Sequence, residues 1–320
     1  MNSFSIRKSL SVLFIGAVTL VIASCSSPDE SLEFSVEEEI SKIENAVARL
    51  EVDGSNIQYS IWLGSPDGDA WYRRNADVQR PAASAIKTAI LLEFFSEQIN
   101  SLDTPFAAST DIIDNPLSPA IGHFDLAQQA AVRRELRGLT SRELAEAMIH
   151  KKHVETNAAY NAAANVIIEY LGGPAALTAR VRDRFPQADG LEIARYMLAD
   201  RQKNADNLLT AESLALVLKR LAQNTLNDAL GDAARSVMLL ESDASRGDHY
   251  YKGGTLTSEP QVRIESGWWD DQGTACIYVV IATRPAGDGN DFDELRANLG
   301  ELSMVVQEVG IHLRDALQAS

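Results

Sequence analysis

Cysteine is scarce in this chain, whose 320 residues include only two, Cys25 and Cys276. Cys25 ends an N-terminal apolar segment that resembles a targeting signal, and Cys276 lies alone in an apolar strand pattern, residues 274 to 281. A solitary cysteine in such a strand is usually a buried, unreactive thiol. Once Cys25 is modified, the mature chain has no second cysteine for a disulfide, which excludes a disulfide-stabilised scaffold.

Positive charge is also in short supply. The chain has 29 Lys and Arg against 45 Asp and Glu, a formal net charge of −16. Removing a signal that contains Arg7 and Lys8 would bring this to about −18. An acidic protein is repelled by phosphate backbones and by anionic lipid headgroups. We therefore expect no nucleic-acid partner.

Histidine is rare as well, with five in the whole chain. His150 and His153 have the spacing of a metal-binding pair, but Lys151 and Lys152 lie between them and disfavour a cation. The chain also contains no nucleotide-binding motif and no internal repeat. We expect no metal and no cofactor.

The N-terminus has the three parts of an export signal. Arg7 and Lys8 are basic, residues 9 to 21 are apolar, and residues 22 to 24 are mostly small; the apolar run is short for a membrane span. With Cys25 next, this resembles the lipobox of bacterial lipoproteins, which implies a signal peptide over residues 1–24 and diacylglycerol on Cys25. The alternative is an ordinary secretory signal followed by a chance cysteine.

Residues 25–38 are polar and acidic and predict a tether between the anchor and a folded domain. The resemblance to lipoproteins implies an extracytoplasmic protein held at a lipid bilayer. Ser26 follows the cysteine where inner-membrane lipoproteins often have aspartate, so an outer membrane is favoured if the cell has one.

The remaining pattern predicts a mixed α/β (α+β) fold. Helical periodicity over residues 36–52 precedes two strands, 57–63 and 70–73, and three more strands, 250–252, 261–268 and 274–282, precede a closing helix over 292–317. We expect one five-stranded antiparallel sheet, flanked by the terminal helices, in an α/β lobe of residues 39–80 and 245–320. Residues 81–244 are mostly helical and predict a second lobe, with an elaboration over 105–138. We expect a monomer.

Ser84 and Lys87 open a helix that is apolar almost all round. Such a helix is buried, and its positions i and i+3 share a face, so the Lys87 amine is expected to reach the Ser84 hydroxyl. A desolvated lysine has a lowered pKa and can serve as a base. The pair predicts an activated serine nucleophile, although a lysine that snorkels to the surface is the alternative.

Together with two later segments, this pair resembles the class A β-lactamases and related penicillin-recognising serine hydrolases, whose S-x-x-K, S-D-N and K-T-G motifs line one cleft. The resemblance runs from about residue 40 to the C-terminus and includes residues 139–145, 165–168 and 171–177. It implies that fold, with Ser84 as nucleophile and Lys87 as base.

The S-D-N position departs from the family. The preferred register places Ala159, Tyr160 and Asn161 there, with Asn165 one turn later; a second register uses Asn157, with Asn161 after it. In either register the serine that relays a proton to the leaving nitrogen is missing. The resemblance implies that Asn161 binds a substrate amide, and Tyr160 is the nearest protic side chain. The alternative is that these asparagines only pack the helix.

The third motif is represented by Lys252, Gly253, Gly254 and Thr255, with glycine in place of the central threonine. The resemblance implies that Lys252 supports the reaction electrostatically and that the Ser84 and Thr255 amides form an oxyanion hole beside Gly254. Arg263 stands where the family often has a carboxylate-binding arginine, for which its planar fork is suited.

The family's water-activating glutamate is missing. Counting from Gly172 and Gly173 aligns Arg195 with it, and Glu192 is three residues too early, so we expect Glu192 to be solvated.

The sequence thus indicates a lipid-anchored serine hydrolase whose acylation is easier than its deacylation, acting on a β-lactam, a D-alanyl peptide or an ester. The alternative is a retired β-lactamase fold that binds cell-wall peptide or a protein partner.

Overall fold

A computed structural model describes residues 34–52, 56–223, 228–287 and 291–319. The chain divides into two units, Met1–Phe34 and Ser35–Ser320, and all described helices and strands belong to the second. The predicted signal peptide, Cys25 and most of the predicted tether lie outside the described residues. Helix α1 begins at Val36, inside the stretch 25–38 that we assigned to the tether, so a tether can extend no further than residue 35.

One antiparallel sheet forms the centre of the described unit. Its order is β2(Ala70–Arg74), β1(Gln58–Gly64), β9(Thr274–Arg284), β8(Gln261–Asp271), β6(Gly247–Tyr251), β5(Leu239–Asp243), and β7(Gly254–Leu256) also pairs with β8. Both ends of the chain contribute strands, as predicted, and all five predicted strands are present.

The described sheet has seven strands, however, and the predicted count of five was wrong. The two additional strands lack a sequence signal for physical reasons. All residues of β5 are exposed, so no apolar alternation marks it, and β7 has only three residues. Since β5 belongs to the sheet, the boundary at residue 244 that we drew for the helical lobe lies too late in the chain.

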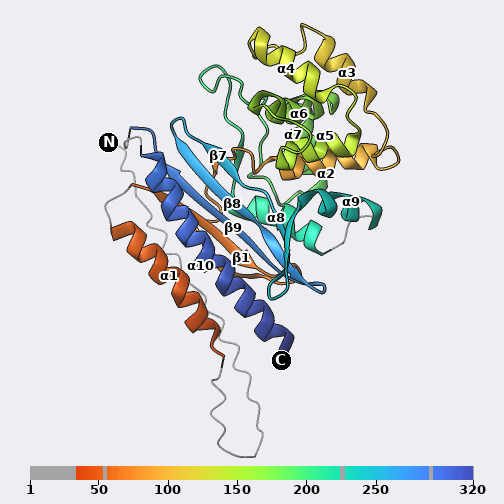
Figure 1. The fold of residues 1–320 in the computed structure, drawn as a ribbon. Coiled ribbons are helices and arrows are strands. Elements are labelled where there is room, and N and C mark those ends of the chain that lie inside the picture. Colours follow the sequence, from red (N-terminus) through yellow and green to blue (C-terminus); the bar gives the residue numbers. More distant parts are fainter. Residues whose placement is uncertain (1–33, 53–55, 224–227, 288–290, 320) are drawn as a thin grey trace, which may run out of the picture. The chain divides into compact units, whose positions relative to one another are not determined.

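The long helices α1(Val36–Val52) and α10(Phe292–Ala319) lie side by side along one face of the sheet (Figure 1). Residues of β9 alternate between the two faces: Cys276, Tyr278 and Val280 pack with the apolar sides of α1 and α10. The residues between them, Ile277 and Val279, join the core on the other face. This period of two is the geometry of a strand buried on both sides.

The other helices lie beyond the opposite face (Figure 1). They are α2(Lys87–Gln98), α3(Ala107–Asp114), α4(Leu126–Leu136), α5(Ser141–His150), α6(Asn157–Tyr170), α7(Pro174–Arg184), α8(Ala211–Ala222) and α9(Asp228–Met238). As the all-round apolar pattern predicted, nine successive residues of α2, from Lys87 to Phe95, are buried. The elaboration predicted over residues 105–138 contains the helices α3 and α4.

Helix starts follow their capping residues. Thr140 closes a reciprocal capping box with Glu143 at the start of α5, the T-x-x-E spacing typical of such boxes. Thr210 closes a similar box at the start of α8, with Ser213 in place of the usual Glu or Gln.

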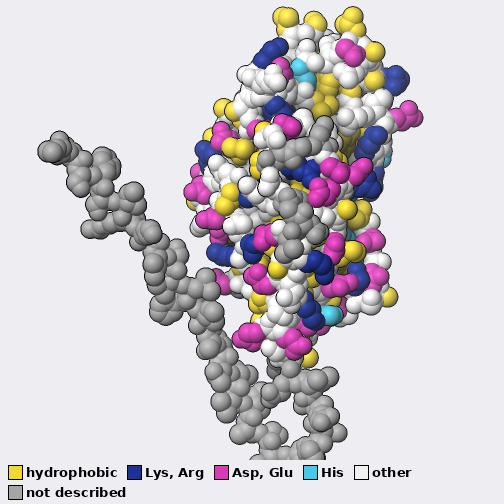
Figure 2. Space-filling model, turned by 90° about the vertical axis from the view of Figure 1, so that its left-hand side faces the viewer, with side chains coloured by type: hydrophobic (Ala, Val, Ile, Leu, Met, Phe, Trp, Pro, Cys, Tyr) yellow, Lys and Arg dark blue, Asp and Glu magenta, His cyan; other side chains and the backbone are white. Residues whose placement is uncertain are grey.

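The charged surface, the buried Cys276 and the character of the helices can each be compared with the sequence. Acidic and basic side chains are interspersed over the face seen in Figure 2. Cys276 is fully buried, and burial raises the pKa of its thiol to about 12, so the predicted inert thiol is confirmed. Among the helices that the structure describes, none combines the length and apolar character that a membrane crossing requires.

Candidate active site

Ser84 lies in the turn that leads into α2. The turn is held by backbone bonds from the Ala85 amide to the Ala82 carbonyl (3.1 Å) and from the Lys87 amide to the Ser84 carbonyl (3.1 Å). The Ala82 amide also donates to the carbonyl of Asn207 (2.7 Å), next to the two-stranded sheet β3(Arg80–Pro81) and β4(Leu208–Leu209). Ser84 is therefore fixed at a helix N-terminus, and it lines a cavity of about 770 Å³.

Lys87 is completely buried beneath this cavity. Its ammonium lies 3.4 Å from the centroid of the Tyr160 ring and donates to the side-chain oxygen of Asn161 (3.3 Å). Burial lowers the pKa of Lys87 to about 7, an effect that the nearby Tyr160 opposes and the charge of Lys252 reinforces. A lysine in this state can lose its proton near neutral pH, as a general base must.

Tyr160 connects the groups around Ser84. Its hydroxyl accepts a hydrogen bond from Lys252 Nζ (2.9 Å), and Lys252 also donates to the carbonyl of Ile149 (2.8 Å). Burial acts to raise the pKa of Tyr160, but the charges of Lys87 and Lys252 and hydrogen bonds from Lys252 and Ser84 together lower it to about 7. The phenol of Tyr160 thus contacts the Ser84 hydroxyl, the Lys252 ammonium and, through its ring, the Lys87 ammonium.

The two asparagine registers can be compared directly. Asn161 contacts Lys87 and donates to both the backbone and the side-chain oxygen of Asn157. Both asparagines line the cavity, but Asn161 is the one that reaches the Ser84–Lys87 turn. Asn165 is fully buried and holds the backbone of Met197 through both its amide atoms, and it also donates to Ala120. Asn165 therefore positions the loop beside the cavity.

Strand β7 approaches the nucleophile closely. A Cβ atom on Gly254 would lie 3.0 Å from the Ser84 nitrogen and 2.9 Å from the Ala85 nitrogen, so only glycine allows this approach. Thr255 follows directly and lines the same cavity. The residues proposed for an oxyanion hole are thereby brought to one edge of the cavity.

Arg263 lies on β8 opposite Thr255 and is already engaged within the protein. Its guanidinium donates to Thr255 Oγ1 (2.7 Å) and, through two nitrogens, to Glu265 Oε1 (2.9 and 2.6 Å). The hydroxyl of Tyr251 donates to the other oxygen of Glu265 and covers the Cα of Gly253, where a side chain would collide with it.

The loop on the far side of the cavity carries no glutamate toward Ser84. Glu192 pairs through its backbone with Leu208 and lies 3.9 Å from Arg182, outside the residues that line the cavity. Arg195, which sequence counting places at the family's glutamate, is 6% exposed and forms an ion pair with Asp206 (2.9 Å). Asp200 and Glu259 are the carboxylates among the described lining residues.

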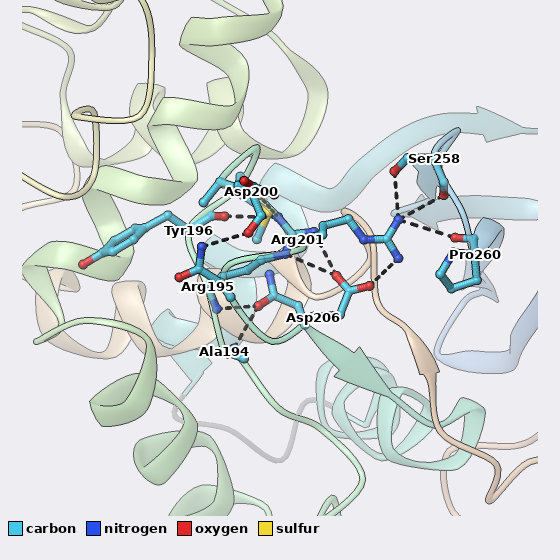
Figure 3. A network of polar contacts seen from close by, with 12 residues as sticks. Ala194, Arg195, Tyr196, Asp200, Arg201, Asp206, Ser258 and Pro260 are labelled. Carbon is cyan, nitrogen blue, oxygen red and sulfur yellow. Dashed lines mark hydrogen bonds and ion pairs between the residues drawn. The ribbon is translucent and has the colours of Figure 1, made fainter. Parts of the chain in front are cut away.

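A network of polar contacts holds this loop in place (Figure 3). Asp206 accepts from both Arg195 and Arg201, and Arg201 reaches across to Ser258 Oγ (2.8 Å) and the Ser258 carbonyl (3.0 Å) in the turn between β7 and β8. Asn207 accepts from the amides of residues 194 and 195 at the base of the loop. The loop and the β7–β8 turn, which both border the cavity, are thus joined by the hydrogen bonds of Arg201.

The structure brings together Ser84, Lys87, Tyr160, Asn161, Lys252, Gly254, Thr255 and Arg263, while Asn165 lies behind the loop. Sequence reasoning missed Tyr251, Glu265, Arg201 and Asp206. A signal existed for Glu265, because residues two apart on a strand share a face and Arg263 is its neighbour there. The ion pairs of Arg201 and Asp206 depend on loop conformation and have no such signal.

The comparisons with known proteins agree with this geometry. The model of the beta-lactamase enzyme family matches residues 42–308. A class A beta-lactamase from Bacteroides cellulosilyticus DSM 14838 superposes with a TM-score of 0.63 at 16% identity, covering 85% of this chain and 98% of that one.

PBP-A superposes with a TM-score of 0.60 at 19% identity, over 88% of this chain and 97% of that one, and a mutant of it has been solved as an acyl-enzyme complex with penicillin G. A beta-lactamase from Sphaerobacter thermophilus DSM 20745 superposes with a TM-score of 0.59 at 18% identity, over 85% and 97%. No curated protein matches the sequence. These likenesses show the class A β-lactamase fold, and the family match shows that the chain belongs to the beta-lactamase enzyme family.

Proposed function

We propose that the protein is a serine hydrolase that forms an acyl-enzyme at Ser84. The observation that carries this proposal is the convergence on one turn of an accessible serine, a fully buried lysine and a phenol bonded to a second lysine. Burying an ammonium costs free energy, and a site used only for packing gains nothing from that cost. Nucleophile activation does gain from it, because the cost lowers the pKa of the base.

In the proposed reaction, the Ser84 oxygen attacks the carbonyl carbon of the acyl donor and its proton passes to the base formed by Lys87 and Tyr160. The bond to the leaving nitrogen, oxygen or sulfur then breaks, and that atom takes up the proton from the Tyr160 hydroxyl. Lys252 supports the transfer by its charge, and the amides of Ser84 and Thr255 hold the oxyanion, a contribution typically of about 10² to 10³ in rate. Water finally hydrolyses the Ser84 ester.

Acylation is proposed to outpace this last step. The acylating groups lie at the turn, whereas Glu192 lies outside the cavity and Arg195 is paired with Asp206. The substrate classes are those that the family's chemistry suggests: a β-lactam, a D-alanyl peptide or a simple ester. The solved penicillin G complex of PBP-A, a protein of the same fold, supports the first of these.

The test is covalent labelling of Ser84 with a fluorescent penicillin and with a fluorophosphonate. We expect at least the fluorophosphonate to label the wild type and neither probe to label Ser84→Ala, with Ser96→Ala as a matched control because Ser96 lies at the far end of the same helix. If neither probe labels the folded wild type, the protein is no hydrolase, and the alternative of a binding protein for cell-wall peptide or a partner protein is preferred.

We also propose that the protein is anchored to a bilayer by lipid on Cys25 and lies outside the cytoplasm. The lipobox-like sequence before Cys25 supports this, and so does the position of the first described helix, which leaves residues 26 to 35 as a spacer.

A further inference from the structure

Strands β7 and β8 form one wall of the cavity. The sequence suggests that this wall is positively charged, but in the structure its charge is largely neutralised. Arg263 is the cation expected to bind a substrate carboxylate there, yet two of its nitrogens donate to Glu265 at 2.9 and 2.6 Å. The side chain of Glu265 is only 16% exposed, which makes this pair a partly desolvated one. Such pairs are screened less by solvent than surface pairs, so Glu265 cancels most of the field of Arg263 at the cavity.

The Glu265 carboxylate also binds a second residue of this wall, Tyr251. Tyr251 donates to Glu265, and burial, reinforced by the charge of Glu265, raises the pKa of Tyr251, so the phenol remains a neutral donor. Its hydroxyl fills the space above Gly253 that a threonine side chain would occupy. Thr255 Oγ1 accepts from Arg263, and the hydroxyl proton is its remaining donor. The wall therefore consists of groups that already satisfy one another.

The other cations around the cavity are also engaged by groups of the protein. The cations that line it are Lys252, Arg195, Arg201 and Arg263, and the carboxylates that line it or pair with these cations are Asp200, Asp206, Glu259 and Glu265. Lys252 is bonded to the Ile149 carbonyl and the Tyr160 hydroxyl, and Arg195 and Arg201 share Asp206. Three of the four lining cations thus have a carboxylate partner, and Lys252 has the Tyr160 hydroxyl and a backbone carbonyl instead.

From this arrangement we infer that the acyl donor carries no carboxylate at the end that lies against β7 and β8, and is a neutral ester, thioester or amide. This inference rests on the proposed function and narrows its substrate classes, because β-lactams of the penicillin type and D-alanyl peptides both bring a free carboxylate. A carboxylate placed at Arg263 would be a like charge beside Glu265 and would have to compete for a guanidinium that is already bonded. Glu265 is the residue that determines this specificity.

The experiment uses two thioesters with the same acyl group, one with thioglycolate as leaving group and one with thioglycolamide, so that only a carboxylate distinguishes them. Each competes with a fluorophosphonate for Ser84, and the concentration that halves the labelling rate is measured for the full chain. For the wild type we expect the neutral thioester to compete at a concentration at least tenfold lower. In Glu265→Gln, which keeps the size of the side chain and removes its charge, the preference should disappear or reverse.

Glu301→Gln serves as the matched control, because Glu301 of α10 pairs with Arg49 of α1 on the opposite face of the sheet. It should retain the wild-type preference. Competition at equal concentrations, stronger competition by the carboxylate, or a preference that Glu265→Gln leaves unchanged would each overturn the inference while leaving the hydrolase intact. Failure of the fluorophosphonate to label Ser84 at all would instead contradict the proposed function.

Discussion

At the scale of single residues, Lys87 and Tyr160 behave as one ionising unit. The Lys87 ammonium lies over the Tyr160 ring, each influences the pKa of the other, and both have a pKa of about 7. Groups coupled this strongly lose their protons in macroscopic steps that belong to the pair. Either a neutral Lys87 or an ionised Tyr160 can accept the Ser84 proton, and both forms appear as the pH rises through about 7.

The rate of Ser84 acylation should therefore rise with pH and level off above about 7. In Tyr160→Phe the rate should fall by about 10² to 10⁴, the usual contribution of a positioned proton carrier. The rising part of the pH–rate curve should also move to lower pH. Tyr160 raises the pKa of Lys87, so without its hydroxyl the lowering of this pKa by burial should be larger. The measurement is fluorophosphonate labelling from pH 5 to 9.

Tyr170→Phe is the matched control for this change, since Tyr170 ends the same helix and its hydroxyl bonds Gln98 away from the cavity. This control should leave both the labelling rate and its dependence on pH unchanged. A Tyr160→Phe variant that labels at the wild-type rate over the whole range would show that the phenol only fills space.

The buried ammonium of Lys87 should also lower the free energy of unfolding of the protein. Its pKa is lowered to about 7 in the folded protein, whereas an unfolded lysine keeps its proton up to a pH of about 10.4. Between these values the unfolded chain binds more protons, so the free energy of unfolding rises with pH there, and the penalty of the buried ammonium is complete below pH 7. Lys87→Met should abolish labelling and raise the free energy of unfolding at pH 6 by roughly 1–4 kcal/mol.

This gain should shrink between pH 7 and 10, and denaturant unfolding at several pH values measures it. Lys203→Met, at a side chain that is 82% exposed, should change the free energy of unfolding little at any pH. A loss of stability in Lys87→Met at pH 6 would mean that Asn161 and Tyr160 compensate the buried charge in full.

How far the sequence predicts this site depends on the range of each interaction. Ser84, Lys87 and Gly254 follow from local patterns, because an apolar helix start and a glycine beside a strand report their surroundings directly. The position of Tyr160 over Lys87 depends on the packing of α6 against α2, which no local pattern contains. The expectation that the Lys87 amine reaches the Ser84 hydroxyl rests on i, i+3 spacing and stays a prediction.

At the scale of elements, the loop of residues 190–207 is positioned by groups from three other segments. Asn165 of α6 holds Met197, the carbonyl of Asn207 accepts from the turn before Ser84, and Arg201 reaches the β7–β8 turn. Regular elements were predictable because their apolar periods report burial, whereas this loop owes its conformation to pairwise polar contacts. Strands β5 and β7 escaped prediction for another reason: β5 is exposed throughout and β7 has only three residues, so neither shows an apolar period.

Removing the Arg201 side chain should loosen this loop and leave the sheet intact. Arg201→Ala deletes the bonds to Asp206 and Ser258, and charge-assisted bonds of this kind contribute about 1.5–3 kcal/mol to local stability. We expect faster amide hydrogen exchange over residues 198–206 and roughly tenfold weaker competition by acyl donors at Ser84. The midpoint of global unfolding should move little.

The control is Arg180→Ala, which removes a solvent-exposed pair between α7 and Glu97 of α2, outside the residues that line the cavity. Exchange over residues 198–206 should then match the wild type. If Arg201→Ala leaves this exchange unchanged, the loop is held by Asn165 and Asn207 alone.

At the scale of the whole molecule, the unit from Ser35 to Ser320 contains the complete described core and every residue proposed to act at the site. The described helices of this unit cover both faces of its sheet. We therefore expect its core and the proposed site to form without residues 1 to 34. A chain that begins at Ser35 should fold and label at Ser84 at the wild-type rate.

Attachment itself depends on one sulfur outside this unit. If Cys25 carries the lipid, a cell that expresses the full chain and is fed an alkyne fatty acid should yield a labelled protein in the detergent-soluble membrane fraction. Cys25→Ala should abolish the lipid label, whereas Cys276→Ala, at a buried cysteine of the sheet, should retain it. A single acyl chain binds a bilayer only marginally, and stable anchoring requires at least two, so the membrane fraction should withstand high salt in the wild type. Release of unlabelled wild-type protein into the soluble fraction would instead identify an ordinary secretory signal in which the cysteine stands by chance.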